Sequence, residues 1–223
     1  MAAREPRRRP VALTWLDTGA VIDLKKEIPA YGARRGRFDV VTVPPLHYLM
    51  VDGRGDPNTA PAHADALASL YPMAYTLKFL SRRELGRDHT VMPLEGLWWA
   101  DDMSTFTSAR DKARWSWTMM IAVPDWITTD HVDAAREQVA RKGTAPVLDA
   151  VRHELLDEGL CVQTLHVGPY DDEGPVLAAM HDEFIPGEGL RMTGRHHEVY
   201  LGDPRRSAPE RLRTILRQPV ARA

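Results

Sequence analysis

Hydrophobic and polar positions alternate along several short segments of this chain, which is typical of strands that bury one face. These segments are residues 39–51, 91–100, 114–124, 160–167 and the stretch that begins at His196. Elsewhere apolar residues recur at spacings of three and four, which predicts helices. We expect these helices over residues 60–83, 125–142, 145–157, 175–184 and 209–216.

One order of elements occurs twice. Residues 43–58 and 160–173 each hold an apolar strand (VPPLHYLMVDG and LCVQTLHVGPY) that runs into a Gly/Asp turn and then a helix. This duplication predicts two stacked modules, and small-molecule pockets tend to form between similar halves. We place the modules at about residues 21–124 and 125–223, after a flexible N-terminal extension of residues 1–20.

Turns and breaks indicate the fold class. Pro44 and Pro45 lie near the start of the first strand, which suits an edge or a bulge. Pro72 falls inside the first helical pattern, so we expect a kink or a break there. No glycine-rich phosphate loop follows a strand and the βαβ rhythm is absent, which favours an α+β fold with antiparallel sheets.

Composition favours a compact protein that binds neither nucleic acid nor a membrane. Of 223 residues, 43% are hydrophobic and 27% charged, enough to bury a substantial core. A formal net charge of -2 indicates no basic face for nucleic acid. The apolar stretch near the N-terminus is too short and interrupted for a signal peptide or a membrane helix. The single cysteine, Cys161, lies in an apolar strand pattern, so we expect a buried thiol in a reducing, cytoplasmic setting.

The nine histidines do not form a recognisable metal motif. His196 and His197 are adjacent, so in a strand they point to opposite faces and do not chelate one ion. His153 and Glu154 resemble the start of a zinc-binding HExxH motif, but position 157 is Asp157. We therefore expect neither a metal nor another cofactor.

Glu198 is the first candidate for chemistry. In HHEVYLGDP, alternation puts Glu198 and Tyr200 on one face of a strand and Val199 on the other. If that face lines a pocket, the carboxylate sits beside a phenol in partly apolar surroundings, where desolvation raises its pKa and makes it a better base. The alternative is an exposed glutamate that faces solvent or an arginine.

Glu95, in MPLEGLWW, is the second candidate. Alternation sets Glu95 on the same side as Leu97 and Trp99, which places a carboxylate among apolar side chains. Two outcomes are open. Either Glu95 faces a pocket, or the strand is irregular at Gly96 and the glutamate reaches solvent.

Aromatic residues complete the candidate site. Six residues are tryptophans, and five of these fall within residues 98–126. Aromatic faces hold planar ligands well, although most tryptophans in any fold are buried. We expect Trp99 or Trp126 to contact a planar aromatic ligand, with Tyr75, Tyr170 and Tyr200 as further lining.

The chain resembles a known family over roughly residues 21–220. The segments VGPYDDEGPVLAAMHDEF and HHEVYLGDPRRSAPERLRTILRQPV are similar to the C-terminal half of GyrI-like small-molecule-binding domains, whose signature is a strand ending Glu-X-Tyr-Leu-X-Asp-Pro. The segments VPPLHYLMVDGRGDPN, YPMAYTLKFL and PLEGLWW resemble the N-terminal half of stand-alone bacterial members. The resemblance implies duplicated strand-helix-strand-strand (SHS2-like) modules around a central ligand cleft. We expect no counterpart of the helix-turn-helix domain of related drug-sensing regulators in this sequence.

Stand-alone members with this pattern include cyclopropanoid hydrolases. The resemblance therefore implies water addition to the strained cyclopropane of DNA-alkylating natural products of the yatakemycin, duocarmycin and CC-1065 type, for detoxification or self-resistance. In that mechanism Glu198 or Glu95 deprotonates a water, and Tyr75 donates a hydrogen bond to the ligand carbonyl. Two alternatives stay open: sequestration of aromatic or cationic drugs, and a protein-binding module similar to gyrase inhibitors, whose partner is unknown.

Overall fold

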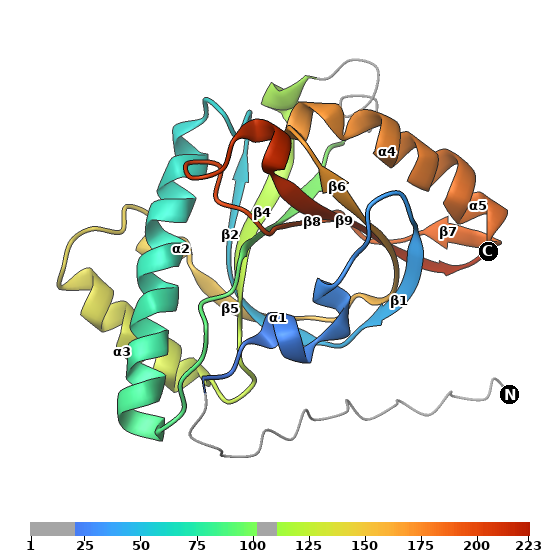
Figure 1. Ribbon diagram of the computed structural model, residues 1–223. Coiled ribbons are helices and arrows are strands. Elements are labelled where there is room, and N and C mark those ends of the chain that lie inside the picture. Colours follow the sequence, from blue (N-terminus) through green and yellow to red (C-terminus); the bar gives the residue numbers. More distant parts are fainter. Residues whose placement is uncertain (1–20, 102–110) are drawn as a thin grey trace, which may run out of the picture.

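The computed structural model describes residues 21–101 and 111–223 and places nine strands in one antiparallel sheet (Figure 1). The strand order is β1-β6-β9-β8-β3-β4-β2-β5, and β7 pairs with β9. The strands are β1 (Asp39–Val43), β2 (Leu46–Arg54), β3 (Leu94–Trp99), β4 (Ser116–Val123), β5 (Arg152–Leu156), β6 (Gly159–Val167), β7 (Leu190–Met192), β8 (His196–Tyr200) and β9 (Arg213–Arg222). The helices are α1 (Leu24–Glu27), α2 (Pro61–Leu80), α3 (Thr129–Ala140), α4 (Gly174–Ala178) and α5 (Ile185–Gly187), with π-helical turns at Ser81–Leu85 and Ala179–Phe184.

The strand order is symmetric about the β8–β3 pair, because two units with the same arrangement of strands lie on either side of it. Strand β2, helix α2 and strands β3 and β4 form one unit, in which β4 lies between β3 and β2. Strand β6, helix α4 and strands β8 and β9 repeat this arrangement, with β9 between β8 and β6. The two units meet where β3 pairs with β8. The α+β class with antiparallel pairing is confirmed.

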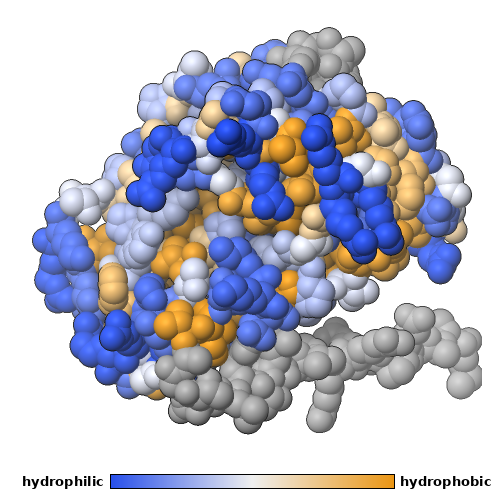
Figure 2. All heavy atoms as spheres, in the orientation of Figure 1, coloured by the Kyte–Doolittle hydropathy of each residue, from blue (hydrophilic) through white to orange (hydrophobic). Residues whose placement is uncertain are grey.

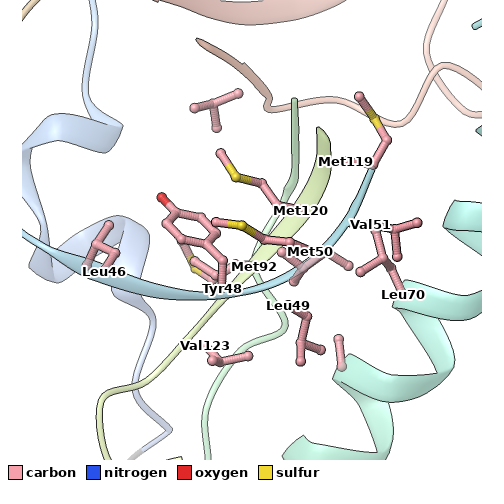
Figure 3. Close-up of a cluster of buried hydrophobic side chains, with 14 of the residues drawn as sticks. Leu46, Tyr48, Leu49, Met50, Val51, Leu70, Met92, Met119, Met120 and Val123 are labelled. Carbon is pink, nitrogen blue, oxygen red and sulfur yellow. The ribbon is translucent and has the colours of Figure 1, made fainter. Parts of the chain in front are cut away.

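Helices α2 and α4 cover the same face of the sheet, which we call the helix-covered face. Figure 3 shows Leu49 of β2 extending toward α2, near Leu70, while Tyr48 and Met50 project to the other side of the strand. At the other end, Met180 packs with Val162 of β6 and Leu216 of β9 beneath the α4 region. Both helices thus flank the central strands β3 and β8 (Figure 1).

The opposite face lies inside the curl of the sheet, and we call it the inner face. Figure 1 shows the strands curving round, with α1 within the curve, and Leu24 and Ile28 from this segment pack in the core. The turn after α1 (Pro29–Tyr31) carries Tyr31, which is 6% exposed. The segment that precedes β1 therefore covers the part of the inner face around Tyr31.

Proline has different effects at its two predicted break points. Pro44 and Pro45 separate β1 from β2, so the single strand expected over residues 39–51 is two strands, and β1 lies at the end of the sheet order. Helix α2 runs through Pro72 without the expected break. The packing of α2 against β2, β4 and α3 holds the helix together despite the missing backbone donor.

Two predicted helices are strands. Residues 145–157 contain β5, which pairs with β2. Residues 209–216 form one short turn and the start of β9, which lies between β6 and β8. Strand β9 is buried on both faces, so its apolar residues do not alternate with polar ones. The spacing of apolar residues in 209–216 resembles that of a helix, which explains the wrong prediction. Within the described ranges, no helix has the length and apolar character needed to cross a membrane.

Candidate functional site

The two candidate glutamates lie on opposite faces of the sheet. In the β3–β8 register, Gly96 is opposite Glu198 and Glu95 is opposite Val199. Since side chains alternate along a strand, Glu198 points to the helix-covered face and Glu95 to the inner face. The two carboxylates therefore belong to two separate sets of polar residues.

On the helix-covered face, Glu198 stands at the end of a short hydrogen-bond chain. The Trp98 indole Nε1 donates to the Tyr200 hydroxyl at 3.0 Å, and this hydroxyl donates to Oε2 of Glu198 at 2.6 Å. Tyr170 meets Tyr200 edge to face, with ring centroids 5.6 Å apart. Together with Glu173, described below, these residues are the outer cluster.

Gly96 leaves the space that the outer cluster occupies. A Cβ at this position would lie 2.8 Å from Trp98 Nε1 and 3.1 Å from the Tyr200 hydroxyl. Any side chain at residue 96 would therefore displace the groups that hold Glu198. The glycine in PLEGLWW has a steric role, and the strand is regular there.

Glu173 is a second carboxyl in the outer cluster. It is 5% exposed and precedes α4, and its Oε1 is buried with no hydrogen-bond partner in the described part of the chain. Burial, and then the negative charge of Glu198, raise the pKa of Glu173 to about 10. Burial, followed by the charges of Glu173 and Glu198, also raises the pKa of Tyr170 to about 12.

The outer cluster thus pairs a proton donor with a proton acceptor. Near neutral pH the Glu173 carboxyl keeps its proton, while Oε2 of Glu198 accepts the Tyr200 hydrogen bond. Two interacting carboxyls whose environments separate their protonation states are the usual arrangement for general acid and base chemistry. Strand β8 supplies Glu198 and the segment before α4 supplies Glu173.

Glu95 lies in a closed network on the inner face and is 0% exposed. Its Oε1 accepts a hydrogen bond from the Tyr31 hydroxyl at 2.7 Å. Its Oε2 accepts from the Tyr48 hydroxyl at 3.2 Å and lies 2.9 Å from Nε2 of His197. Glu95 is therefore buried and does not reach solvent, and it lies on the opposite face of the sheet from Glu198.

The inner network continues from His197 to a second ion pair. His197 Nδ1 lies 2.9 Å from Glu158 Oε2, and the Arg217 guanidinium donates to the same oxygen at 3.3 Å. Burial lowers the pKa of His197, but Glu158 and Glu95 outweigh it and raise the value to about 9. Burial raises the pKa of Glu158, but His197 and Arg217 together lower it to about 2.

The charges of the inner network balance. Glu95 and Glu158 contribute two negative charges, while His197 and Arg217 contribute two positive ones. Arg217 also donates to the backbone carbonyl of Ala30 at 2.7 Å, which ties β9 to the segment that precedes β1. Buried charges that are fully paired and hydrogen-bonded hold structure together, so we assign this network to stability.

The structure gathers only part of the predicted site. Glu198, Tyr170 and Tyr200 come together, whereas Trp99 lies on the inner face with the Arg195 guanidinium 3.5 Å from its ring centroid. Trp126 donates to Ser81 just beyond the end of α2.

Tyr75 lies on α2 and is 50% exposed. It interacts electrostatically with Tyr71, which in turn affects the pKa of Tyr170. The α2 tyrosines are therefore at the margin of the outer cluster, and no hydrogen bond joins Tyr75 to it within the described residues.

Sequence reasoning missed Glu173 and most of the inner network. Glu173 stands in the run GPYDDEG, whose composition indicates only a turn. Cys161 is buried as expected, and burial raises its pKa to about 12. Among the residues that the structure describes, no three His, Cys, Asp or Glu side chains gather in a way that could hold a metal ion.

Comparisons with known proteins agree with this fold. The family model of the GyrI-like small molecule binding domain matches residues 37–221. An uncharacterized conserved protein from Listeria innocua is 38% identical, with a TM-score of 0.81 over 90% of this chain and 100% of its own. Two structures named as hydrolases from Listeria innocua are each 37% identical, with TM-scores of 0.80 and 0.78 over 91% and 90% of this chain and all of theirs. No curated protein matches the chain.

Proposed function

This chain belongs to the family of GyrI-like small-molecule-binding domains, and on that premise we propose that it is a cofactor-independent hydrolase of reactive cyclopropanes in planar aromatic compounds. The proposal rests on the outer cluster, in which a neutral carboxyl and a hydrogen-bonded carboxylate lie beside aromatic rings. Two relatives named as hydrolases support the reaction class.

We place the ligand on the helix-covered face between α2 and α4. Figure 2 shows hydrophobic residues reaching the surface in this region, among strongly hydrophilic ones. Tyr170 is 36% exposed, so a planar ligand has access to its ring. Aromatic faces favour flat ligands, and the carboxyl groups beneath supply the few polar contacts that orient them.

The reaction divides between the two carboxyls. Glu198 takes a proton from a water, whose oxygen forms a bond to the cyclopropane carbon. The strained carbon–carbon bond breaks, and its electron pair passes through the conjugated ring to the ligand carbonyl oxygen. Glu173 gives its proton to that oxygen, so the sum of the reaction is the addition of one water. Proton transfer from Glu198 to Glu173, through solvent or Tyr200, restores the starting state. In a cell this reaction would destroy a DNA-alkylating group before it reached DNA.

A second function, sequestration of aromatic cations, rests on the same carboxylate. Glu198 amid tyrosine rings offers a counter-charge and ring faces for a cationic drug. The substitution Glu198→Gln separates the two functions. A hydrolase loses turnover and keeps most of its affinity, whereas a sequestering protein loses affinity.

The test is incubation with a cyclopropane-bearing duocarmycin-type compound, with the gain of one water followed by mass spectrometry. We expect turnover by the wild type and a loss of about 100-fold or more in kcat for Glu198→Gln and for Glu173→Gln. Tight binding with no water addition would replace the hydrolase with sequestration. Full activity in both variants would show that the outer cluster is not the active site.

A further inference from the structure

Two histidines border Glu198 and play no part in the chemistry described so far. His196 lies two residues before Glu198 on the same strand and the same face. His181, from the π-helical turn Ala179–Phe184, packs against it with ring centroids 5.8 Å apart. The side chain of His196 is 10% exposed and that of Glu198 is 13% exposed.

Three ring nitrogens of these two histidines lack hydrogen-bond partners within the described residues. Nδ1 and Nε2 of His196 and Nε2 of His181 are buried, and none has a hydrogen-bond partner within the described residues. A buried polar atom without a partner is destabilising, so native proteins usually satisfy such atoms with ordered water or a ligand. Three such atoms in adjacent rings indicate a binding site for a small polar molecule such as water.

The carboxylate of Glu198 has one oxygen directed at the same place. Its Oε2 is taken by the Tyr200 hydroxyl, whereas Oε1 lies 3.5 Å from Nε2 of His196 without forming a hydrogen bond. A water bound to Oε1 would be within reach of Nε2. Burial, and then the neighbouring His196, lower the pKa of His181 to about 4, so His181 is neutral near pH 7 and keeps an acceptor nitrogen.

We propose that His196 and His181 form a buried water site next to Oε1 of Glu198, and that His196 orients the water that attacks the substrate. One O–H of the water donates to Nε2 of His196 and the other to Oε1 of Glu198, which leaves an oxygen lone pair free for attack. Glu198 takes the proton as the new carbon–oxygen bond forms, and His196 does not change its protonation. The catalytic part of this inference rests on the proposed function, whereas the water site does not.

The water site is tested directly by a high-resolution crystal structure of the unliganded protein. We expect a water within hydrogen-bond distance of both Nε2 of His196 and Oε1 of Glu198. An empty site, or a direct His196–Glu198 hydrogen bond that leaves no room for water, would overturn the inference whatever the protein's activity.

The catalytic part is tested with His196→Phe and His196→Gln on the cyclopropane substrate. Misplacing the attacking group costs up to about 100-fold, so we expect kcat to fall by about 10- to 100-fold in His196→Phe with KM within twofold of wild type. His196→Gln should keep more activity, because its amide oxygen still accepts a hydrogen bond from water. His89→Gln is the matched control, since His89 is 1% exposed with an unpaired Nε2 outside the cluster.

The outcomes separate the two proposals. Wild-type turnover with an unchanged kcat in His196→Phe would refute the role of His196 and leave the hydrolase intact. A parallel loss in His89→Gln would show that the effect is one of general stability, and would also refute that role. No turnover by the wild type would refute the hydrolase, and the crystal structure would still decide whether the water site exists.

Discussion

The substitution Glu95→Gln should destabilise the protein strongly, whereas Glu198→Gln should not. Both substitutions replace a carboxylate by an amide of nearly the same shape, one on β3 and one on its partner strand β8, so the two changes in side-chain volume are the same. Glu95 is completely buried and receives hydrogen bonds from Tyr31 and Tyr48. Its amide would also leave the charged His197 with a single carboxylate partner, Glu158.

The expected magnitude follows from the charge balance of the inner network. The wild type buries two carboxylates with two cations, and Glu95→Gln leaves one carboxylate with two cations. Breaking a buried ion pair by removing one partner costs about 3–5 kcal/mol. For a protein of this size each kcal/mol lowers the melting temperature by about 2–4 °C, so Glu95→Gln should melt roughly 6–20 °C below wild type.

Glu198→Gln has a different balance. The Tyr200 hydroxyl can still donate to the amide oxygen, and the neighbouring Glu173 carboxyl is already neutral near pH 7, so no ion pair is broken. We expect a change of less than about 1 kcal/mol in the free energy of unfolding. Urea unfolding at pH 7, followed by tryptophan fluorescence, measures both variants. If Glu95→Gln unfolds within about 1 kcal/mol of wild type, the assignment of the inner network to stability is wrong.

Three further predictions concern the outer cluster and the core. Glu173→Gln should remove a loss of stability at high pH. The Glu173 carboxyl ionises near pH 4.5 in the unfolded chain but keeps its proton to about pH 10 in the folded protein, so the stability of the wild type falls between these two pH values. Melting temperatures of wild type and variant measured across this range test the prediction, and an equal pH dependence of the two would contradict it. Gly53→Ala should lower the free energy of unfolding in urea by about 3 kcal/mol or more, because its Cβ would lie 2.0 Å from the buried Trp117 ring. Gly174→Ala is the control: its Cβ would have no atom within 4 Å, so it should lower the free energy of unfolding by less than about 1 kcal/mol. Equal losses in the two variants would refute this packing argument. Tyr200→Phe should lower kcat by about tenfold or more, since it removes the donor that orients the Glu198 carboxylate and keeps the ring; steady-state kinetics measure this, and an unchanged kcat would refute it.

The sequence predicted the elements that have one covered face or clear turn residues. The sequence pattern predicted the duplicated strands β2 and β6. Alternation in HHEVYL correctly placed Glu198 and Tyr200 on the same face. Strand β9 was missed because both of its faces are covered, which removes the period of two. Strands β4 and β6 are also buried along most of their length, but turn residues follow both of them (Pro124, and Gly168 with Pro169), and they were predicted.

The division of the candidate site between two faces could not be predicted. Alternation placed Glu95 on the side of Leu97 and Trp99, but which face this is depends on the pairing of β3 with β8, about 100 residues later in the chain. The partners of Glu95 are equally distant in sequence, since Tyr31 and His197 come from the turn after α1 and from β8. Such contacts arise from topology, and a single sequence does not display them.

The most direct test of the account is a crystal structure with a bound planar aromatic ligand, such as the ring-opened product of a duocarmycin-type compound. We expect the ligand on the helix-covered face between α2 and α4, in contact with Tyr170 and with polar atoms near Glu198 and Glu173. A ligand bound on the inner face, against Glu95 and His197, would contradict the account, because it would make the balanced inner network the binding site.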